Sequence, residues 1–366
     1  MNQLTMPNVT LFDLLARNWQ RQAPVHHLCF NEDDTLLAIG SVDGALALAR
    51  LGDNEPPESR IVVDNGQTTI QPRQGKPSPL ISTRIHEGTR LSAYRDGAFL
   101  AATRSGELLR VDRTGAIMAK VLSDKGPICA FDHCRATDII AVALSHRLRL
   151  QSAETDTIRE IDLGDRKPTI ASISVDGRLV ALAGSGSLSV WGIADDPDLL
   201  IEVSLPSSPL SLKWSADGRW FGCGLQTGGL VLVNAVTGDN VMLADFPGPV
   251  ATLDWSPVAN TVLASGAYRI AGWSMDAPPP GARATGRAGF VMVDAVAAHP
   301  VKALVAAGYP NGRIAVAPIG SPEELIVRDA GGPVTALQWS KDGRHLAVGD
   351  ALGNAAIVTF PNEIFK

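Results

Sequence analysis

The sequence lacks the features that mark a membrane-spanning or an exported protein. No uninterrupted apolar run is long enough to span a bilayer, and the segment from Met1 to Gln20 contains neither a basic start nor a continuous apolar stretch. Cysteine is scarce, with four residues in 366, and without an export signal these four are expected to be free thiols. The sequence therefore predicts a cytoplasmic protein that does not enter a membrane.

An excess of basic residues is also missing. The chain has 32 Lys and Arg against 38 Asp and Glu, so its net charge of −6 gives no general attraction for phosphate backbones or anionic lipid. We therefore expect no binding to nucleic acid. Only 19% of the residues are charged, whereas glycine (35) and proline (24) are plentiful. This composition suits short strands joined by tight turns, and it predicts an all-β fold.

A repeat of about 41 residues runs along most of the chain. The clearest unit, "SADGRWFGCGLQTGGLVLVNAVTGD" from Ser215 to Asp239, reads as three strands separated by an Asp-Gly turn and a glycine turn. In each unit one aromatic or branched residue closes the first strand. The eight residues are Phe30, Tyr94, Phe131, Ile173, Trp214, Trp255, Val296 and Trp339. Because a function would not need eight copies of one residue, we interpret them as packing residues between repeats.

A period near 40 with three or four strands in each unit is typical of a β-propeller, whose blades bury their faces only against one another. The sequence predicts one propeller domain over residues 1–366 with eight four-stranded blades, and seven blades are the alternative. The last unit ends at Phe360, too early for an outer strand of its own. The N-terminal "TLFDLLARNW" is expected to supply that strand and close the ring, although an amphipathic helix from Leu11 to Trp19 fits the same residues.

The repeats resemble those of WD-repeat proteins. The likeness lies in the order of strands and turns in "WSADGRWFGCGLQTGGLVLVNAVTGD" and in "CFNEDDTLLAIGSVDGALAL". No Gly-His pair opens a unit and no Trp-Asp pair ends one, so the hydrogen-bonded tetrad of that family is not expected; Val190-Trp191-Gly192 comes nearest. The resemblance implies a divergent WD-repeat propeller that serves as a scaffold or adaptor for protein partners.

Two segments interrupt the repeat. The longer, residues 64–88, contains proline and glycine without helical periodicity and is predicted to be a loop. Counted as far as Arg90, it carries four basic side chains against Glu87, a local charge of +3 on an acidic protein. The shorter, residues 277–289, is a Pro-rich loop between units six and seven.

Motifs for catalysis or metal binding are missing. The densest group of metal-ligating residue types is "CAFDHC", from Cys129 to Cys134, but no second cysteine pair accompanies it and strand alternation sends its side chains to different faces. The sequence has no Gly-x-Ser-x-Gly and no His-Glu-x-x-His, and the glycines of "GCGLQTGG" lie between strands instead of opening a helix. We therefore predict a protein that is not an enzyme and that needs no cofactor or metal.

The polar and aromatic residues that packing does not explain lie in the turns between second and third strands, which share one face of the disc. Tyr268 and Tyr309 are one repeat length apart and are predicted to occupy the same turn of adjacent blades, beside Arg269 and Asn311. Tyr and Arg are enriched among binding hot spots. We predict a protein-binding site for an acidic partner, formed by Tyr268, Arg269, Tyr309, Asn311, Arg73, Lys76, Arg84 and Arg104.

An enzyme or a propeller that binds a small ligand or metal in its central channel is the alternative. Residues from all blades converge in that channel, so a polar cluster can form there without any local motif. The candidates are His26, His146, His299 and Asp254. The sequence makes no prediction about the oligomeric state.

Overall fold

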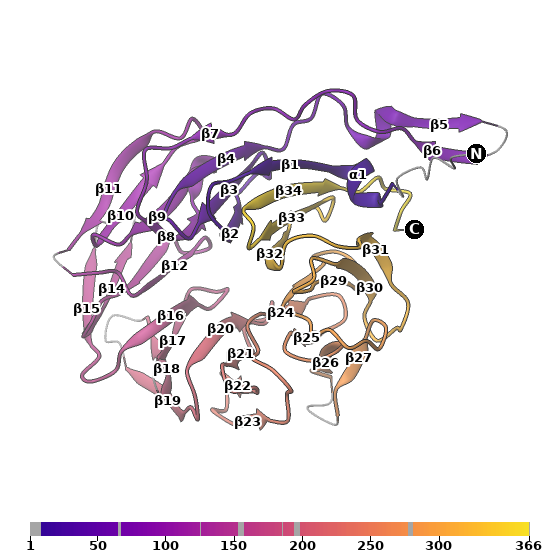
Figure 1. Cartoon of the computed structure of the whole chain (residues 1–366). Coiled ribbons are helices and arrows are strands. Elements are labelled where there is room, and N and C mark those ends of the chain that lie inside the picture. Colours follow the sequence, from indigo (N-terminus) through magenta and orange to yellow (C-terminus); the bar gives the residue numbers. More distant parts are fainter. Residues whose placement is uncertain are drawn as a thin grey trace.

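Eight four-stranded antiparallel sheets are arranged in a ring around a central channel (Figure 1). The computed structural model describes residues 9–64, 67–124, 126–152, 157–184, 186–193, 198–276 and 281–365. Each sheet is one blade, and its strands are called a to d from the channel outward. The predicted eight-bladed propeller is confirmed. No helix in these described ranges is long and apolar enough to cross a membrane.

Blades one to four are formed in chain order. Blade one has β2 (Val25–Phe30), β3 (Leu36–Ser41), β4 (Leu46–Arg50) and β7 (Ile81–Ser82). Blade two has β8 (Gly88–Ala93), β9 (Phe99–Thr103), β10 (Glu107–Val111) and β11 (Ile117–Ser123). Blade three has β12 (Ala130–Cys134), β13 (Ile139–Ala143), β14 (Arg147–Ser152) and β15 (Ile158–Asp162). Blade four has β16 (Pro168–Ile173), β17 (Leu179–Gly184), β18 (Ser187–Gly192) and β19 (Leu199–Ser204).

Blades five to eight complete the ring. Blade five has β20 (Pro209–Trp214), β21 (Trp220–Leu225), β22 (Leu230–Asn234) and β23 (Asn240–Leu243). Blade six has β24 (Leu253–Ser256), β25 (Thr261–Ala264), β26 (Ile270–Ser274) and β27 (Arg283–Thr285). Blade seven has β28 (Ala295–Ala298), β29 (Leu304–Gly308), β30 (Ile314–Pro318) and β31 (Leu325–Arg328). Blade eight has β32 (Val334–Trp339), β33 (His345–Asp350), β34 (Asn354–Thr359) and, from the N-terminus, β1 (Ala16–Gln20).

The core lies between the blades. All eight residues that were predicted to pack there are at most 7% exposed. The three tryptophans among them also donate a ring hydrogen bond to strand a of the preceding blade: Trp214 to Ser172 O (3.1 Å), Trp255 to Lys213 O (3.0 Å) and Trp339 to Ala297 O (3.1 Å). The packing interpretation is confirmed, because each ring both fills the space between two blades and joins their backbones.

The register of the repeat differs from the sequence alignment in three blades. Strand a of blade five ends with the pair Trp214 and Phe221, and the corresponding pairs in blades three and seven begin with His133 and Ala298. In blade two the corresponding pair begins with Ala93, so the predicted residue Tyr94 lies one position too late. The predicted residues Phe131 and Val296 therefore lie two positions too early. They share a strand face with the true counterparts, which explains why they are buried as well. His133 replaces the tryptophan, and its Nδ1 lies 3.1 Å from Ala93 O.

The N-terminal segment closes the ring, as predicted. Strand β1 pairs with β34 in antiparallel register from Ala16 opposite Val358 to Gln20 opposite Asn354. The alternative is partly correct too, because a short helix α1 (Leu11–Leu15) precedes the strand and is capped reciprocally by Thr10 and Asp13. Helix α1 packs against β31, so the segment joins blade eight to blade seven.

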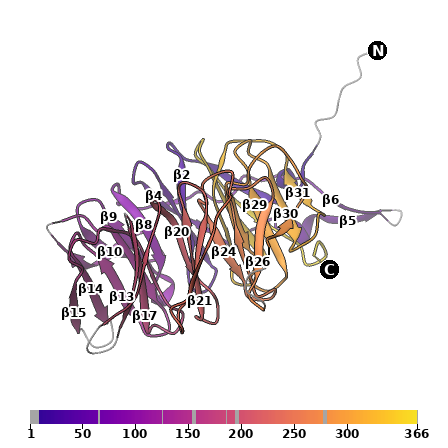
Figure 2. The same cartoon turned by 90° about the horizontal axis from the view of Figure 1, so that it is seen from below.

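The long insertion starts before residue 64, after strand β4, and is not a loop throughout. It contains the 3-10 turn η1 (Pro57–Arg60) and a hairpin of β5 (Ile61–Asp64) and β6 (Gln67–Ile70) that projects from the ring (Figure 2). It then returns along the outside of blade one as β7 (Figure 1). Residues 65–66 of this insertion, and residues 277–280 of the Pro-rich loop, lie outside the described residues.

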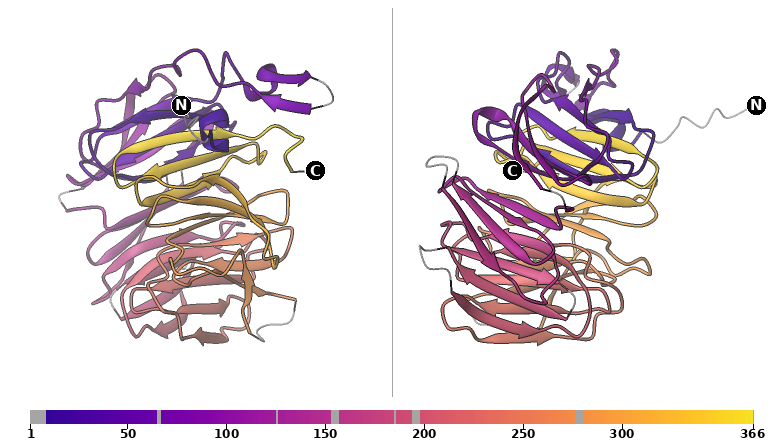
Figure 3. Two further views of the ribbon diagram at one scale, coloured as in Figure 1. Left: turned by 45° about the vertical axis from the view of Figure 1, so that its right-hand side comes forward. Right: turned by 90° about the vertical axis from the view of Figure 1, so that its left-hand side faces the viewer.

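The insertion crosses the seam where the ring closes, and we call residues 51–80 the strap. Its contacts with the N-terminal segment are hydrogen bonds from Arg60 Nη2 to Leu14 O (2.7 Å) and from Trp19 Nε1 to Ser78 O (2.8 Å). Arg17 is only 2% exposed and reaches the start of the strap, where its guanidinium donates to Arg50 O, Leu51 O and Gly52 O. Figure 3 shows the strap beside the strands of blade eight.

Candidate functional site

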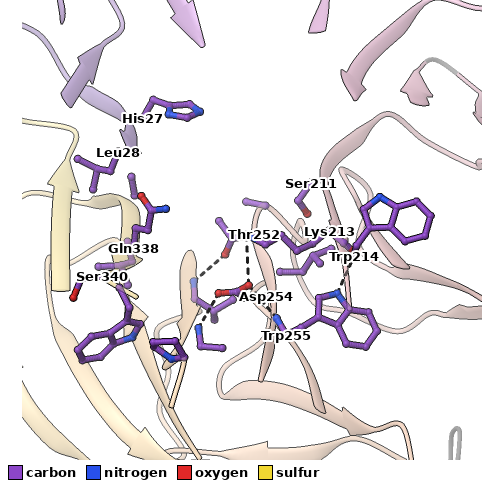
Figure 4. A pocket seen from close by; sticks show the side chains of 18 of the residues that line it. His27, Leu28, Ser211, Lys213, Trp214, Thr252, Asp254, Trp255, Gln338 and Ser340 are labelled. Atoms are coloured by element: carbon purple, nitrogen blue, oxygen red, sulfur yellow. Dashed lines mark hydrogen bonds and ion pairs between the residues drawn. The ribbon is translucent and has the colours of Figure 1, made fainter. Parts of the chain in front are cut away.

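A cavity of about 610 Å³ occupies the central channel (Figure 4). Its lining comes from strand a of blades one, five, six, seven and eight, and includes His26, Ser211, Lys213, Asp254 and Gln338. Ligand pockets in proteins are commonly of this size. The channel is therefore a candidate binding site.

Strand alternation decides which side chains enter the channel. In each strand a, the residue before the inter-blade packing residue points the opposite way, toward the channel axis. Lys213, Asp254 and Gln338 stand immediately before Trp214, Trp255 and Trp339, and Asp132 stands before His133. Cys29 holds the same position before Phe30, and burial raises the pKa of its thiol to about 12, so that this thiol stays protonated.

Two carboxylates in the channel connect neighbouring blades. Asp254 accepts hydrogen bonds from Trp255 N in its own blade and from Ala298 N in the next blade, both at 3.0 Å. Asp132 does the same with His133 N (2.9 Å) and Ile173 N (2.8 Å). Burial raises the pKa of Asp132, although both hydrogen bonds lower it. Each carboxylate therefore uses one oxygen for each blade and stabilises their junction.

Lys213 interacts electrostatically with both carboxylates. Its Nζ lies 3.6 Å from Asp254 Oδ1, and its side chain is 55% exposed, to the channel. The Asp254 carboxylate raises the pKa of this ammonium group, against the effect of desolvation, and Asp132 raises it further. The lysine therefore remains charged throughout the physiological pH range.

His27, at the edge of the channel, gives a testable pH dependence. Burial lowers its pKa from 6.5 to about 4, with the charges of His26 and Arg90 acting in the same direction. The unfolded chain therefore takes up this proton as the pH falls through 6.5, whereas the folded chain does so only near pH 4. The contribution of neutral His27 to the free energy of unfolding is therefore fully present above pH 6.5. It is lost as the pH falls from 6.5 to 4, which lowers the free energy of unfolding by about 3 kcal/mol.

We expect His27→Leu to reduce the loss of unfolding free energy between pH 7 and pH 4.5 by about 2 to 3 kcal/mol. Urea denaturation at the two pH values measures this difference. His146, on an exposed turn, provides the control variant His146→Asn, which is expected to retain the wild-type pH dependence. An unchanged pH dependence in His27→Leu would contradict the assignment.

The structure brings together two of the four channel candidates. His26 and Asp254 line the cavity. His299 instead packs between blades, with its Nε2 3.0 Å from Gly343 O and its ring against Trp339, and His146 lies on the exposed turn between β13 and β14. Lys213, Asp132 and Gln338 were not among the predicted site residues. The available signal was their position one residue before each packing residue.

The residues predicted to bind a protein partner do not form one group. Tyr268 is 47% exposed, whereas Tyr309 is 6% exposed and packs in the core between blades six and seven. Trp255 and Ala298 occupy equivalent positions in strand a of these two blades. Their separation in sequence is larger than that of the two tyrosines, so the tyrosines do not occupy equivalent positions. Asn311 accepts a hydrogen bond from Arg313 N within its own turn (3.1 Å).

The predicted basic residues are also dispersed. Arg73 forms an ion pair with Asp53 inside the strap and is 13% exposed, so it stabilises the strap and is not presented to a partner. Arg104 donates to Val42 O (2.9 Å) across two neighbouring turns. Lys76 and Arg84 are exposed. Of this set, the last two are the most accessible to an acidic group.

An exposed aromatic side chain that was not among the predicted site residues lies on the connection that is hydrogen-bonded to the Tyr268 turn. Phe290 is fully exposed and Val291 is 37% exposed, in the connection from blade six to blade seven. This connection is held to the Tyr268 turn by Val293 N donating to Ala267 O and by Gly266 N donating to Val293 O (both 2.9 Å). We call Tyr268, Arg287, Phe290 and Val291 the Phe290 patch. The repeat alignment did not reveal it because the connection lies outside the repeat.

Arg269 stabilises the start of the connection that carries Phe290. Its Nε donates to Gly286 O at 2.7 Å and its Nη2 donates to Ala284 O at 3.2 Å. Arg287 is exposed, and its guanidinium has no ion-pair partner among the residues that the structure describes. Arg269 therefore positions the connection, and Arg287 is the cation that this surface presents.

Comparison with solved structures identifies the kind of propeller. No family model and no curated protein matches the sequence. The computationally designed Ika8 protein is 16% identical with a TM-score of 0.69, over 95% of this chain and 99% of that one. The C-terminal WD40 domain of Sif2 is 16% identical with a TM-score of 0.65, over 94% and 99%. The chain has the fold of a WD40 β-propeller.

A third similar structure is the β-propeller domain of Cps50 (Swd1) from Myceliophteria thermophila, 16% identical with a TM-score of 0.56 over 75% of this chain and 97% of that one. The predicted resemblance to WD-repeat propellers is confirmed at the level of the fold. Within the described part of this WD40 propeller, no three His, Cys, Asp or Glu side chains gather as metal ligands, and the four cysteines are free.

Proposed function

We propose that this protein is a non-enzymatic, cytoplasmic adaptor that holds a protein partner on its b–c face, the face formed by the turns between strands b and c and by the connections between blades. The Phe290 patch is the observation that supports this function. Exposure of a phenylalanine and of a tyrosine on two hydrogen-bonded segments is unfavourable in water, and such residues are typical anchors of protein interfaces.

Further apolar side chains lie on the same face. Val42 (45% exposed) and Leu352 (64% exposed) occupy the b–c turns of blades one and eight. Arg287 adds a positive charge that needs a counter-charge on the partner when water is excluded. The partner is therefore expected to present an apolar pocket for Phe290 together with acidic side chains.

Three substitutions in the Phe290 patch test the proposal: Tyr268→Ser, Phe290→Ser and Arg287→Glu. A matched control on the opposite face combines Val175→Ser, Val258→Ser and Arg178→Glu, which replace side chains that are also exposed. We expect the patch variant to recover at least about tenfold less partner than wild type in affinity purification from the native cytoplasm, because the loss of an aromatic anchor alone costs about 2 kcal/mol or more.

The control variant is expected to recover the same partners as wild type, and both variants are expected to keep the wild-type melting temperature, since all six residues are exposed. Equal recovery by the patch variant and wild type would rule out this surface. Loss of the partner from the control variant instead would assign binding to the opposite face.

A further inference from the structure

We propose that the central channel binds a carboxylate group, with the Lys213 ammonium as its anchor. This site is separate from the Phe290 patch and does not depend on it. The inference rests on which polar groups in the cavity still have unused hydrogen-bonding capacity, and on the size of the space in front of them.

The two channel carboxylates already have their donors. Each oxygen of Asp132 and of Asp254 accepts a backbone N–H at 2.8 to 3.0 Å, and these bonds join successive blades. A cation from solution would have to compete with these backbone donors. The acidic groups are therefore structural, and they are poor candidates for ligand binding.

Lys213 is in the opposite situation. An ammonium group has three donors, and in the described part of the chain the Lys213 ammonium has one ion-pair contact, 3.6 Å from Asp254 Oδ1. A charge-assisted hydrogen bond between nitrogen and oxygen is normally about 2.7 to 2.9 Å long. The ammonium therefore has donors available for an acceptor that enters the cavity, and Figure 4 shows the lysine directed into that space.

The charge balance permits an anion. Lys213 and Arg90 both interact electrostatically with Asp132, and Lys213 also interacts with Asp254. The two cations offset the two carboxylates, so this group of four charges is neutral overall. His27, with its pKa near 4, adds no charge at neutral pH. An incoming carboxylate therefore meets no excess of negative charge in this group, and the Lys213 ammonium offers it donors.

The remaining walls of the cavity accommodate a short carbon chain. Leu28, Leu253 and Leu337 line the same space, which has a volume of about 610 Å³. The carboxylate can belong either to a small free acid or to an aspartate or glutamate side chain that a partner inserts. The chemistry at Lys213 is the same for both sources.

Lysine signals in NMR spectra provide a direct test. The chain has eight lysines, so the full-length protein labelled with ¹³C at lysine Cε gives few signals, and Lys213→Gln assigns the relevant one. The probes are sodium acetate, sodium glutarate and N-acetyl-glutamate N′-methylamide, each titrated at constant ionic strength. Methylammonium chloride is the cation probe, and sodium chloride is the reference.

We expect the Lys213 signal to shift saturably with the carboxylates, while the signals of the other lysines follow the chloride reference. Lys213→Gln should abolish saturable binding, detected on backbone amides of β20 and β24, and Lys213→Arg should retain it. The control variant Lys167→Gln should bind as wild type does. Tighter binding of glutarate supports a free acid, and tighter binding of the blocked glutamate supports a side chain from a partner.

Two results would overturn the proposal. A Lys213 shift that is linear and equal to that caused by chloride means that the channel has no carboxylate site. Saturation by methylammonium in place of the carboxylates means that the site binds cations. Neither result bears on the Phe290 patch, whose test uses different residues and a different readout.

Discussion

Removal of the N-terminal segment from Met1 to Gln20 will open the ring. The truncated chain loses β1, and with it the antiparallel ladder to β34, the buried side chains Phe12 and Leu15, and the hydrogen bonds of Arg17. Two buried apolar side chains alone contribute about 3 to 6 kcal/mol, which approaches the total stability of many domains. The edge of β34 is also left unpaired, and such an edge promotes aggregation.

We therefore expect the truncated protein to be largely insoluble, or to melt at least about 10 °C below wild type where it stays soluble. Calorimetry and size-exclusion chromatography measure both outcomes. A deletion that stops at residue 8 preserves every contact of the described chain and serves as the control. A synthetic peptide of residues 9–21, added in trans, should restore part of the stability. A truncated protein that melts like wild type would contradict the closure role of β1.

Trp339→Ala is expected to lower the free energy of unfolding by about 3 to 5 kcal/mol, because it leaves a large cavity between blades seven and eight. The ring is 7% exposed, and it contacts His299 and Phe360 at centroid distances of 4.8 and 5.5 Å. It also donates the hydrogen bond to Ala297 O. Urea denaturation of the purified variant measures the loss.

The contribution of the hydrogen bond can be separated from that of the packing. Trp339→Phe keeps most of the ring but leaves Ala297 O without this donor, and we expect it to cost about 1 to 2 kcal/mol more than the change in volume alone. The matched control is Trp220→Phe, since the Trp220 ring has no hydrogen bond among the described residues and is only partly buried. Equal costs for the two variants would show that the ring hydrogen bond contributes nothing.

The number of blades and the closure of the ring could be predicted because a propeller imposes its period on the sequence. Each blade must bury both faces against its neighbours, so the packing residue recurs near every 41st position. The register was wrong in blade two, where Ala93 takes the place of the aromatic residue, and in two further blades. In blade three His133 takes the place of the tryptophan, and in blade seven Ala298 does.

The channel was not predictable in the same way. Asp132, Lys213 and Asp254 come from blades three, five and six, and no local spacing connects them. The strap was misjudged for a related reason. In the sequence, Arg73 is one basic residue in a proline-containing segment, and nothing there shows that it forms an ion pair with Asp53. Nor does the sequence show that Arg17 donates its hydrogen bonds to backbone carbonyl groups. Partners distant in sequence or located on the backbone leave no local pattern.

The strap has a consequence for the order of events during synthesis. Strand β1 leaves the ribosome before the other strands of the ring, but its pairing partner β34 is the last strand of the ring to be synthesised. Arg17 and Trp19, in contrast, contact residues only 33 to 59 positions away, in and beside the strap. Because short loops are easier to close than long ones, the nascent chain can secure β1 against blade one at an early stage. The ring then closes onto a strand that is already in place, so the final step resembles intramolecular docking and not a search by a free terminus.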